Sequence, residues 1–199
     1  MEIRALGLVK PAWAALFNGA LTGLLALCFL LFASGVQAQA LLPVPALSGH
    51  VIDQSGTLDA ATQAALEQKL TAFEKTKGSQ IVVLLVPTTA PEDIASYANR
   101  IGNAWKIGRA GVGDGLILVI TMQDKRMRFE VAKALEGALP DLAASRIIEN
   151  VLKPAFRRGD YAGGIDLALD HVMARINGEP LPEVEPQDAP GKKGADWSG

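Results

Sequence analysis

Acidic side chains at chain turns are the first candidates for chemistry in this sequence. Asp53 precedes a Gln-Ser-Gly turn, Asp114 lies between two glycines, and Asp141 follows a proline. Two further turn acids are Asp124 and Glu136. Ca²⁺ and Mg²⁺ take oxygen ligands, often loop carboxylates, so these acids would form a cation site where their loops meet at one end of a sheet. The alternative is structural, because an aspartate in a turn commonly accepts hydrogen bonds from its own backbone.

A glycine-rich loop over Gly108–Gly115, which includes Asp114, is the second candidate. It lacks the Gly-Lys-Ser/Thr end of a phosphate-binding P-loop. It also precedes an aliphatic run, whereas the dinucleotide-binding glycine motif follows a strand and opens a helix. Two interpretations stay open. The glycines either form a flexible connector with positive φ angles, or they expose backbone groups and Asp114 to a ligand such as a cation.

Nucleophilic catalysis has little support in the residue types. The chain has two histidines, His50 and His171, and no Gly-x-Ser-x-Gly elbow. Its single cysteine, Cys28, lies in the apolar N-terminal segment. A chain without that segment has no thiol nucleophile, no disulfide and no cysteine-based zinc site. The basic run Lys125–Arg128 is typical of a solvated hairpin, with anion binding as the alternative.

The elements that position these residues alternate between helix and strand. The stretch before Gly78 has apolar residues at helical spacing, with Thr57 or Asp59 as N-cap and the glycine as the stop. The aliphatic runs Ile81–Val86 and Leu116–Ile120 indicate strands that are covered on both faces.

The rest of the domain continues this alternation. Pro91 is expected to open a second helix, with Asp93 near its positive end. Apolar and charged residues alternate over 126–131, which predicts a strand with one dry and one wet face. A helix follows Pro140 and is expected to bury Leu142, and another runs to about residue 177. The order predicts an α/β fold over residues 48–177, a single three-layer α/β sandwich with a small mixed β-sheet flanked by helices on both faces.

Residues 1–40 have the features of a secretory signal peptide. Two basic residues precede an apolar stretch that is densest over 21–32, and small residues follow it. Cleavage is expected after Ala38 or Ala40, which places the mature chain in the periplasm or outside the cell, without a membrane span. The alternative is an uncleaved anchor in the inner membrane, although its dense apolar core is shorter than the roughly 20 residues that a bilayer requires.

The flanking segments and the overall charge narrow the function further. Residues 41–47 are apolar and interrupted by prolines, so they are expected to form an extended lead-in. Residues 178–199 are rich in proline and acids, which predicts a disordered tail. The net charge of −2 argues against a nucleic-acid binder, which normally carries a basic patch or balance.

Four segments of the sequence carry a family resemblance. They read VIDQSGTL at 51–58, WKIG at 105–108 with DGLILV at 114–119, LEGALPD at 135–141 and FRRGDY at 156–161. Together they resemble the TPM domain family, which includes YgcG-like bacterial proteins and a plant thylakoid lumen acid phosphatase. The likeness spans about residues 49–177.

The resemblance implies an exported α/β domain, commonly periplasmic or tethered to the membrane in bacteria. It also implies Ca²⁺ or Mg²⁺ binding by loop acids, for which Asp53, Asp114 and Asp141 are the matching positions. Phosphatase activity belongs to the plant branch. Many members have Gly-x-Gly before Leu-Glu-Gly, whereas this chain has Ala132-Lys133-Ala134 there. The two alanines restrict the backbone and argue against a binding role for this loop.

Two functional hypotheses result. The first is an accessory protein outside the cytoplasm that binds a divalent cation and supports the assembly or maintenance of envelope or membrane proteins. The alternative is a metal-dependent acid phosphatase of the periplasm. In that case Asp53 and Asp114 would hold the cation, and Arg109 would orient the phosphate.

Overall fold

The computed structural model describes residues 40–178, so most of the expected signal segment and the tail from residue 179 lie outside the described residues. Among the described residues, no helix combines the length and apolarity that crossing a bilayer requires. The elements in chain order are β1 Val51–Asp53, α2 Ala60–Lys77, β2 Gln80–Val86, α3 Ile94–Trp105, β3 Gly115–Thr121, β4 Arg126–Val131, the 3₁₀ turn η1 Lys133–Leu135, α4 Asp141–Ile147, the π-helical turn η2 Ile148–Leu152, α5 Lys153–Arg157 and α6 Tyr161–Asn177.

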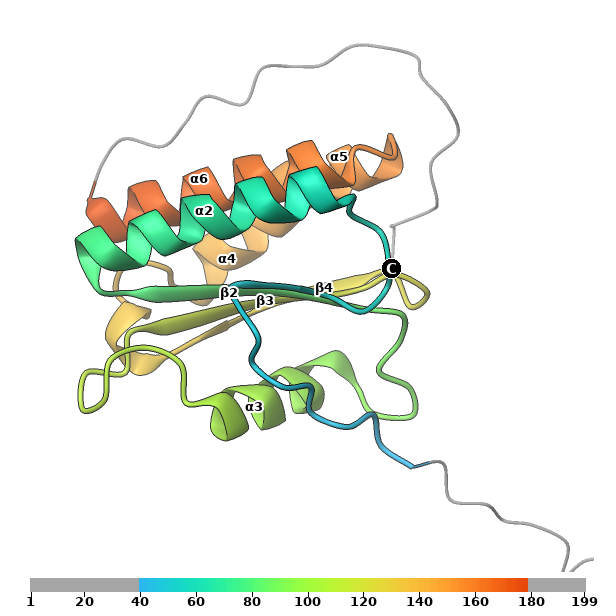
Figure 1. Ribbon diagram of the computed structural model, residues 1–199, viewed down its shortest axis with the longest axis horizontal. Helices are drawn as coiled ribbons and strands as arrows, with labels where there is room; N and C mark the ends of the chain where they lie inside the picture. The colour runs from blue at the N-terminus through green and yellow to red at the C-terminus, as the bar shows by residue number, and fades with distance from the viewer. Residues whose placement is uncertain (1–39, 179–199) are drawn as a thin grey trace, which may run out of the picture. The chain divides into compact units, whose positions relative to one another are not determined.

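The sheet has four strands in the order β1-β2-β3-β4. The first three strands run parallel, and β4 runs antiparallel to β3. Figure 1 shows α2, α4, α5 and α6 over one face of the sheet and α3 against the other. The expected three-layer α/β sandwich with a small mixed sheet is therefore confirmed.

Two hydrophobic clusters lie on the two faces of the central strands. Val83 and Leu85 of β2 face the cluster formed with α2 and α6, whereas Val82 and Leu84 face the cluster formed with α3. Because β2 and β3 are covered on both faces, their sequences are continuous aliphatic runs. Burying each such side chain stabilises the fold by roughly 1.5–3 kcal/mol relative to leaving it exposed.

Side-chain caps fix where the two long helices before β3 begin. Asp59, rather than Thr57, caps α2 by accepting a hydrogen bond from the backbone of its first turn, and Gly78 ends that helix with a φ of 84°. The expectation that Pro91 opens α3 is wrong, because the proline lies in the loop before the helix. Asp93 instead caps α3 with its carboxylate, which accepts two backbone N–H groups of the first turn.

The segment after Pro140 is one continuous helical run rather than separate helices. It begins with α4, passes through the π-helical turn η2 and ends with α5. Pro154 lies in the first turn of α5 and has no N–H to continue the α-helical ladder. Leu142 was expected on the buried face but is 65% exposed. The buried face of α4 consists of Ala143, Ala144 and Ile147.

The lead-in before β1 lies against α3. The side chain of Arg100 donates from Nη2 to the carbonyl of Leu42 at 2.7 Å, and Trp105 donates from Nε1 to the carbonyl of Pro45 at 2.8 Å. Leu42 and Val44 pack against the cluster on the α3 side of the sheet. These contacts make the lead-in part of the folded domain.

Candidate functional site

Asp53 lies at the carboxyl end of β1 and organises the turn that follows. Its Oδ1 accepts hydrogen bonds from the N–H of Ser55 at 2.8 Å, from the Ser55 hydroxyl at 2.6 Å and from the N–H of Gly56 at 3.0 Å. Its Oδ2 accepts the N–H of Leu58 at 2.8 Å. Both carboxylate oxygens are therefore engaged by the chain between β1 and α2, as in other aspartate-stabilised turns.

Asp114 lies just before β3 and is 2% exposed. Its Oδ1 accepts the backbone N–H of Arg109 at 2.7 Å, and its Oδ2 accepts Nε of the same arginine at 2.8 Å. The Nη2 atom of Arg109 lies 2.7 Å from Oδ2 as well. Burial raises the pKa of Asp114, but the hydrogen bonds and the charge of Arg109 outweigh burial and hold this pKa below its usual value. The carboxylate is thus ionised and already neutralised by a cationic side chain.

The sheet topology separates Asp53 from Asp114. Asp53 pairs with Leu85, which pairs with Ile120 near the carboxyl end of β3, whereas Asp114 precedes the amino end of that strand. The six residues from Asp114 to Ile120 correspond to about 20 Å along the strand. A bound Ca²⁺ or Mg²⁺ lies within about 2.6 Å of its oxygen ligands, so these two acids cannot share one ion.

Asp141 lies elsewhere, beside the outer strand β4. It is the first residue of α4 and lines a hollow of about 540 Å³ together with Glu130 and Glu136. Because Asp53 lies far from Asp114, the structure does not bring the three predicted ligands to one ion. Within residues 40–178, no group of three acidic, histidine or cysteine side chains is placed to hold a metal ion.

Close packing against backbone requires the glycine at position 108 of the glycine-rich loop, whereas Gly78 meets a flexible side chain and Gly111 meets open space. A Cβ at Gly108, which has a φ of 92°, would lie 2.5 Å from the backbone nitrogen of Gly115. A Cβ at Gly78 would lie 2.8 Å from the guanidinium carbon of Arg109. Gly111 has a φ of 79° but has nothing within 4 Å of its Cβ position. The loop is therefore a folded structure closed by Arg109 and Asp114, which supports the connector interpretation more than the ligand-cradle interpretation.

The turn acid Asp124 is also engaged within the fold, at the carboxyl edge of the parallel strands. Its Oδ2 accepts the N–H of Thr89 at 3.0 Å and lies 2.9 Å from the hydroxyl of Thr88. The hollow beside it measures about 390 Å³ and is lined by Glu92 and Arg126 among others. This edge is where open α/β sheets commonly bind ligands. Here Asp124 instead fixes the loop after β2 to the β3–β4 hairpin.

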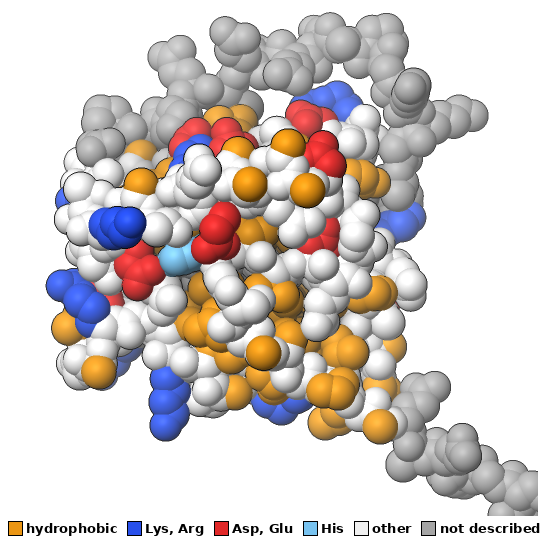
Figure 2. Space-filling model, viewed as in Figure 1, with side chains coloured by type: hydrophobic (Ala, Val, Ile, Leu, Met, Phe, Trp, Pro, Cys, Tyr) orange, Lys and Arg blue, Asp and Glu red, His pale blue; other side chains and the backbone are white. Residues whose placement is uncertain are grey.

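His50 contacts two acidic side chains that are distant from it in the sequence. Its Nδ1 lies 2.7 Å from Glu67 and its Nε2 lies 2.5 Å from Glu74, both on α2. Figure 2 shows a histidine flanked by acidic side chains on this face. Burial lowers the pKa of His50, but the two glutamates outweigh it and raise this pKa. The Thr71 hydroxyl is 3.4 Å from Nδ1, which Glu67 already binds.

His171 is buried on the inner side of α6, and its Nε2 has no hydrogen-bond partner within residues 40–178. Burial lowers its pKa, which keeps the ring neutral at pH 7. In residues 40–178, neither histidine is therefore paired with a nucleophile in the manner of a catalytic dyad.

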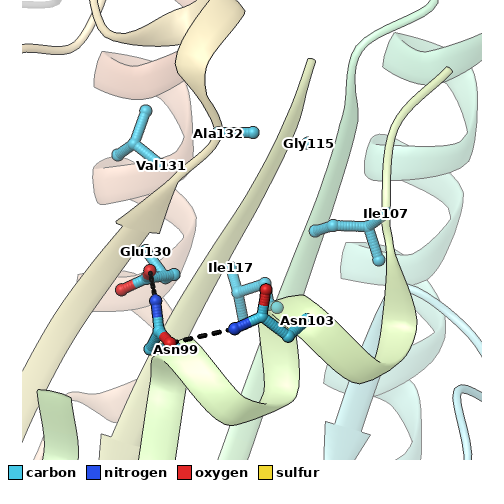
Figure 3. Close-up of a pocket in the computed structure, with 9 residues that line it drawn as sticks. Asn99, Asn103, Ile107, Gly115, Ile117, Glu130, Val131 and Ala132 are labelled. Carbon is cyan, nitrogen blue, oxygen red and sulfur yellow. Dashed lines mark hydrogen bonds between the residues drawn. The ribbon is translucent and has the colours of Figure 1, made fainter. Parts of the chain in front are cut away.

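A further, small hollow lies between α3 and the sheet. Figure 3 shows Asn99 and Asn103 of α3 in a chain of hydrogen bonds with Glu130 of β4, at 2.9 Å between the two asparagines and 3.3 Å to the carboxylate. The hollow measures about 190 Å³. Small-molecule sites usually measure roughly 300–1,000 Å³, so this hollow is too small for most cofactors.

The fold and these sites define an α/β domain built on a single four-stranded sheet. The model of the TPM domain matches residues 51–175. The match covers more than half of the sequence, so the chain belongs to the TPM domain family. The resemblance found in the four sequence segments is thereby confirmed. No curated protein matches the chain significantly.

Solved structures support the same fold. The N-terminal domain of a protein from P. gingivalis is 30% identical, with a TM-score of 0.60 over 64% of this chain and 82% of that domain. The BA42 protein from Bizionia argentinensis is 16% identical, with a TM-score of 0.56 over 69% of this chain and 94% of BA42. The N-terminal domain of cg2496 from Corynebacterium glutamicum is 14% identical, with a TM-score of 0.51 over 73% of this chain and 91% of that domain. The last two similarities concern the fold alone.

Proposed function

We propose that this chain is an exported accessory protein of the TPM family, which supports the assembly or maintenance of envelope proteins by binding them. The observation that carries the proposal is the pairing of Arg109 with Asp114. This pairing engages, within one loop, the two side chains that phosphate chemistry would need. Because Arg109 and Asp114 already satisfy each other, the pairing supports the accessory hypothesis over the phosphatase hypothesis.

The alternative hypothesis, a metal-dependent phosphatase, requires an arrangement that the geometry does not favour. It needs Asp53 and Asp114 on one cation, yet they lie at opposite ends of the parallel strands. It also needs Arg109 to contact a phosphate, yet its guanidinium contacts Asp114 at 2.7 Å. In addition, neither histidine is poised to activate a nucleophile among the described residues.

Divalent-cation binding by Asp53, Asp114 or Asp141 stays a prediction. The three donors do not fit one shared ion, because Asp53 and Asp114 lie at opposite ends of the parallel strands. A Ca²⁺ or Mg²⁺ ion bound at one of them would need water for most of its ligands, an arrangement that Mg²⁺ commonly adopts. We therefore derive no step of the function from a bound metal.

Export to the periplasm or secretion is part of the proposal and is supported by the basic, apolar and small-residue pattern of residues 1–40. The intact mass of the exported protein distinguishes the two interpretations of this segment. A mass that corresponds to a chain beginning at Gln39 or Leu41 supports cleavage. A full-length mass in the membrane fraction supports the anchored alternative.

The accessory role is tested by comparing envelope fractions of host cells. Cells that lack the chain are complemented either with the full chain or with a variant that lacks residues 1–40 and stays in the cytoplasm. The proposal expects reduced amounts or incomplete assembly of specific envelope proteins in the deletion, restored only by the full chain. Unchanged envelope proteins in the deletion, or equal rescue by the cytoplasmic variant, would contradict it.

A further inference from the structure

The outer edge of β4 is an open strand edge. In the antiparallel ladder, Ala132 donates its N–H to the carbonyl of Gly115 at 2.9 Å. Because hydrogen-bonded pairs alternate along such a ladder, the even-numbered residues of β4 turn their backbone groups toward β3. The outward groups belong to Met127, Phe129 and Val131. They have no hydrogen-bond partner within residues 40–178, and such an edge is a template for another strand.

Two hollows border this edge and differ in charge. The hollow of about 540 Å³ at the carboxyl end of β4 is lined by three carboxylates, those of Glu130, Glu136 and Asp141, and by one base, Arg128. The hollow of about 300 Å³ at the amino end is lined by three basic side chains and one acid: Lys125, Arg126, Lys153 and Glu149. The edge is therefore acidic at one end and basic at the other.

We propose that this edge pairs with the same edge of a second copy of the chain, in antiparallel orientation. With Phe129 opposite Phe129 of the second copy, Met127 lies opposite Val131, and this row is apolar. In the same register Arg128 lies opposite Glu130 of the second copy, and the reciprocal pair forms as well. Directly opposite residues of an antiparallel pair have Cβ atoms about 5 Å apart, within reach of an ion pair.

Charge complementarity selects a second copy over an arbitrary peptide. An antiparallel partner must present basic residues beside the acidic hollow and acidic residues beside the basic hollow. Lys125 and Arg126 lie at the amino end of β4 and Glu130 lies near its carboxyl end, so a second β4 meets both requirements at once. The pattern Met-Arg-Phe-Glu-Val is complementary to its own reverse, in both the apolar and the charged positions. The pairing joins two four-stranded sheets into one, and this inference stands independently of the proposed function.

The test is the association of the full exported chain, measured by sedimentation velocity over a wide concentration range. The wild type is expected to form a dimer. Arg128→Glu places like charges opposite each other and is expected to weaken the dimer by about tenfold or more. The double variant R128E/E130R restores opposite charges and is expected to regain the wild-type dissociation constant. Lys77→Glu in the last turn of α2, which packs against β1 and β2, makes the same charge change away from the edge and is expected to have no effect.

A second measurement does not depend on any variant. Amide exchange of the wild type is expected to slow with rising concentration at Met127, Phe129 and Val131, whereas their even-numbered neighbours are protected at every concentration. The thermal midpoint of each variant at low concentration controls for altered folding of the monomer. A chain that stays monomeric at all concentrations would overturn the proposal, as would a dimer that R128E leaves unchanged or concentration-independent exchange at the three amides.

Discussion

The guanidinium of Arg109 lies against the carboxylate of Asp114, with Nη2 2.7 Å from Oδ2, while the backbone N–H of the same arginine donates to Oδ1. Asp114 is buried, whereas more than half of the Arg109 side chain is exposed, at 57%. The arginine therefore supplies from within the chain the positive charge that a bound cation would supply. This pairing closes the glycine-rich loop in front of β3.

Removing the charge of Asp114 should destabilise the fold. Asp114→Asn leaves the buried group with weaker acceptors for Arg109, which should lower the free energy of unfolding by about 1–3 kcal/mol at pH 7. Urea unfolding measures this loss. Asp141→Asn is the matched control, because Asp141 is exposed and the loss should be much smaller. Equal losses in the two variants would contradict the structural role of Asp114.

The same pair predicts a pH dependence. The pKa of Asp114 is lowered in the folded state, so its contribution to stability is fully present above the usual value of 3.8. It is lost as the pH falls through the lowered pKa, because the proton then binds the unfolded chain first. The stability difference between wild type and Asp114→Asn should therefore be constant near neutral pH and shrink only in strong acid. A difference that already shrinks near pH 6 would contradict this account.

His50 should give the opposite pH dependence. Its pKa is raised above 6.5 by Glu67 and Glu74, so its stabilising contribution is fully present below 6.5 and is lost as the pH rises through the folded value. Near pH 6, His50→Gln should lower the free energy of unfolding by roughly 1–2 kcal/mol, because it removes hydrogen bonds between charged groups. Near pH 9 the loss should be smaller. Chemical unfolding at the two pH values tests the sign. A loss that grows with pH would contradict the ion-pair assignment.

The close packing of the loop predicts unequal effects of two glycine substitutions. Gly108→Ala combines a positive φ with a Cβ that would contact the backbone of Gly115, whereas Gly111→Ala has only the positive φ. The strain of the φ alone costs about 1 kcal/mol, so Gly111→Ala should lose about that amount and Gly108→Ala clearly more. Thermal unfolding of both variants is the measurement. Equal losses would show that the loop can move away from Gly115.

The separation of the acids predicts the outcome of a cation titration. Ca²⁺ and Mg²⁺ are added to the exported chain, and amide shifts are followed in ¹H–¹⁵N spectra. Because Asp53 and Asp114 lie about 20 Å apart along the strands, their neighbourhoods should not shift together with one dissociation constant. Saturable shifts that share one constant at Asp53, Asp114 and Asp141 would establish the single site that this geometry argues against.

Local patterns in the sequence were sufficient to predict most of the fold. The aliphatic runs of β2 and β3 predict buried strands because only a sheet covered on both faces needs such runs. The cap at Asp59 and the stop at Gly78 follow from groups that lie within one turn of the helix end. The expected burial of Leu142 is wrong because the π-helical turn η2 changes the helical phase between α4 and the apolar residues that follow it.

Predicting which acidic residues lie close together requires knowledge of the sheet topology. Asp53 ends its strand and Asp114 precedes its strand, so in a parallel sheet the two must lie at opposite ends. Residue types alone did not reveal this, because the strand directions were not fixed by the sequence. The spacing of the two partners of His50 is visible in the sequence. Glu67 and Glu74 are seven residues apart, which places both on one face of α2.

The most direct test of the account is phosphate release by the exported chain. p-Nitrophenyl phosphate is supplied with Mg²⁺, with Ca²⁺ or with a chelator, and wild type is compared with Asp114→Asn under conditions where both are folded. The account predicts no metal-dependent rate above the protein-free blank and no difference between the two proteins. A metal-dependent rate that the chelator abolishes and that Asp114→Asn loses would contradict the accessory role and establish a phosphatase.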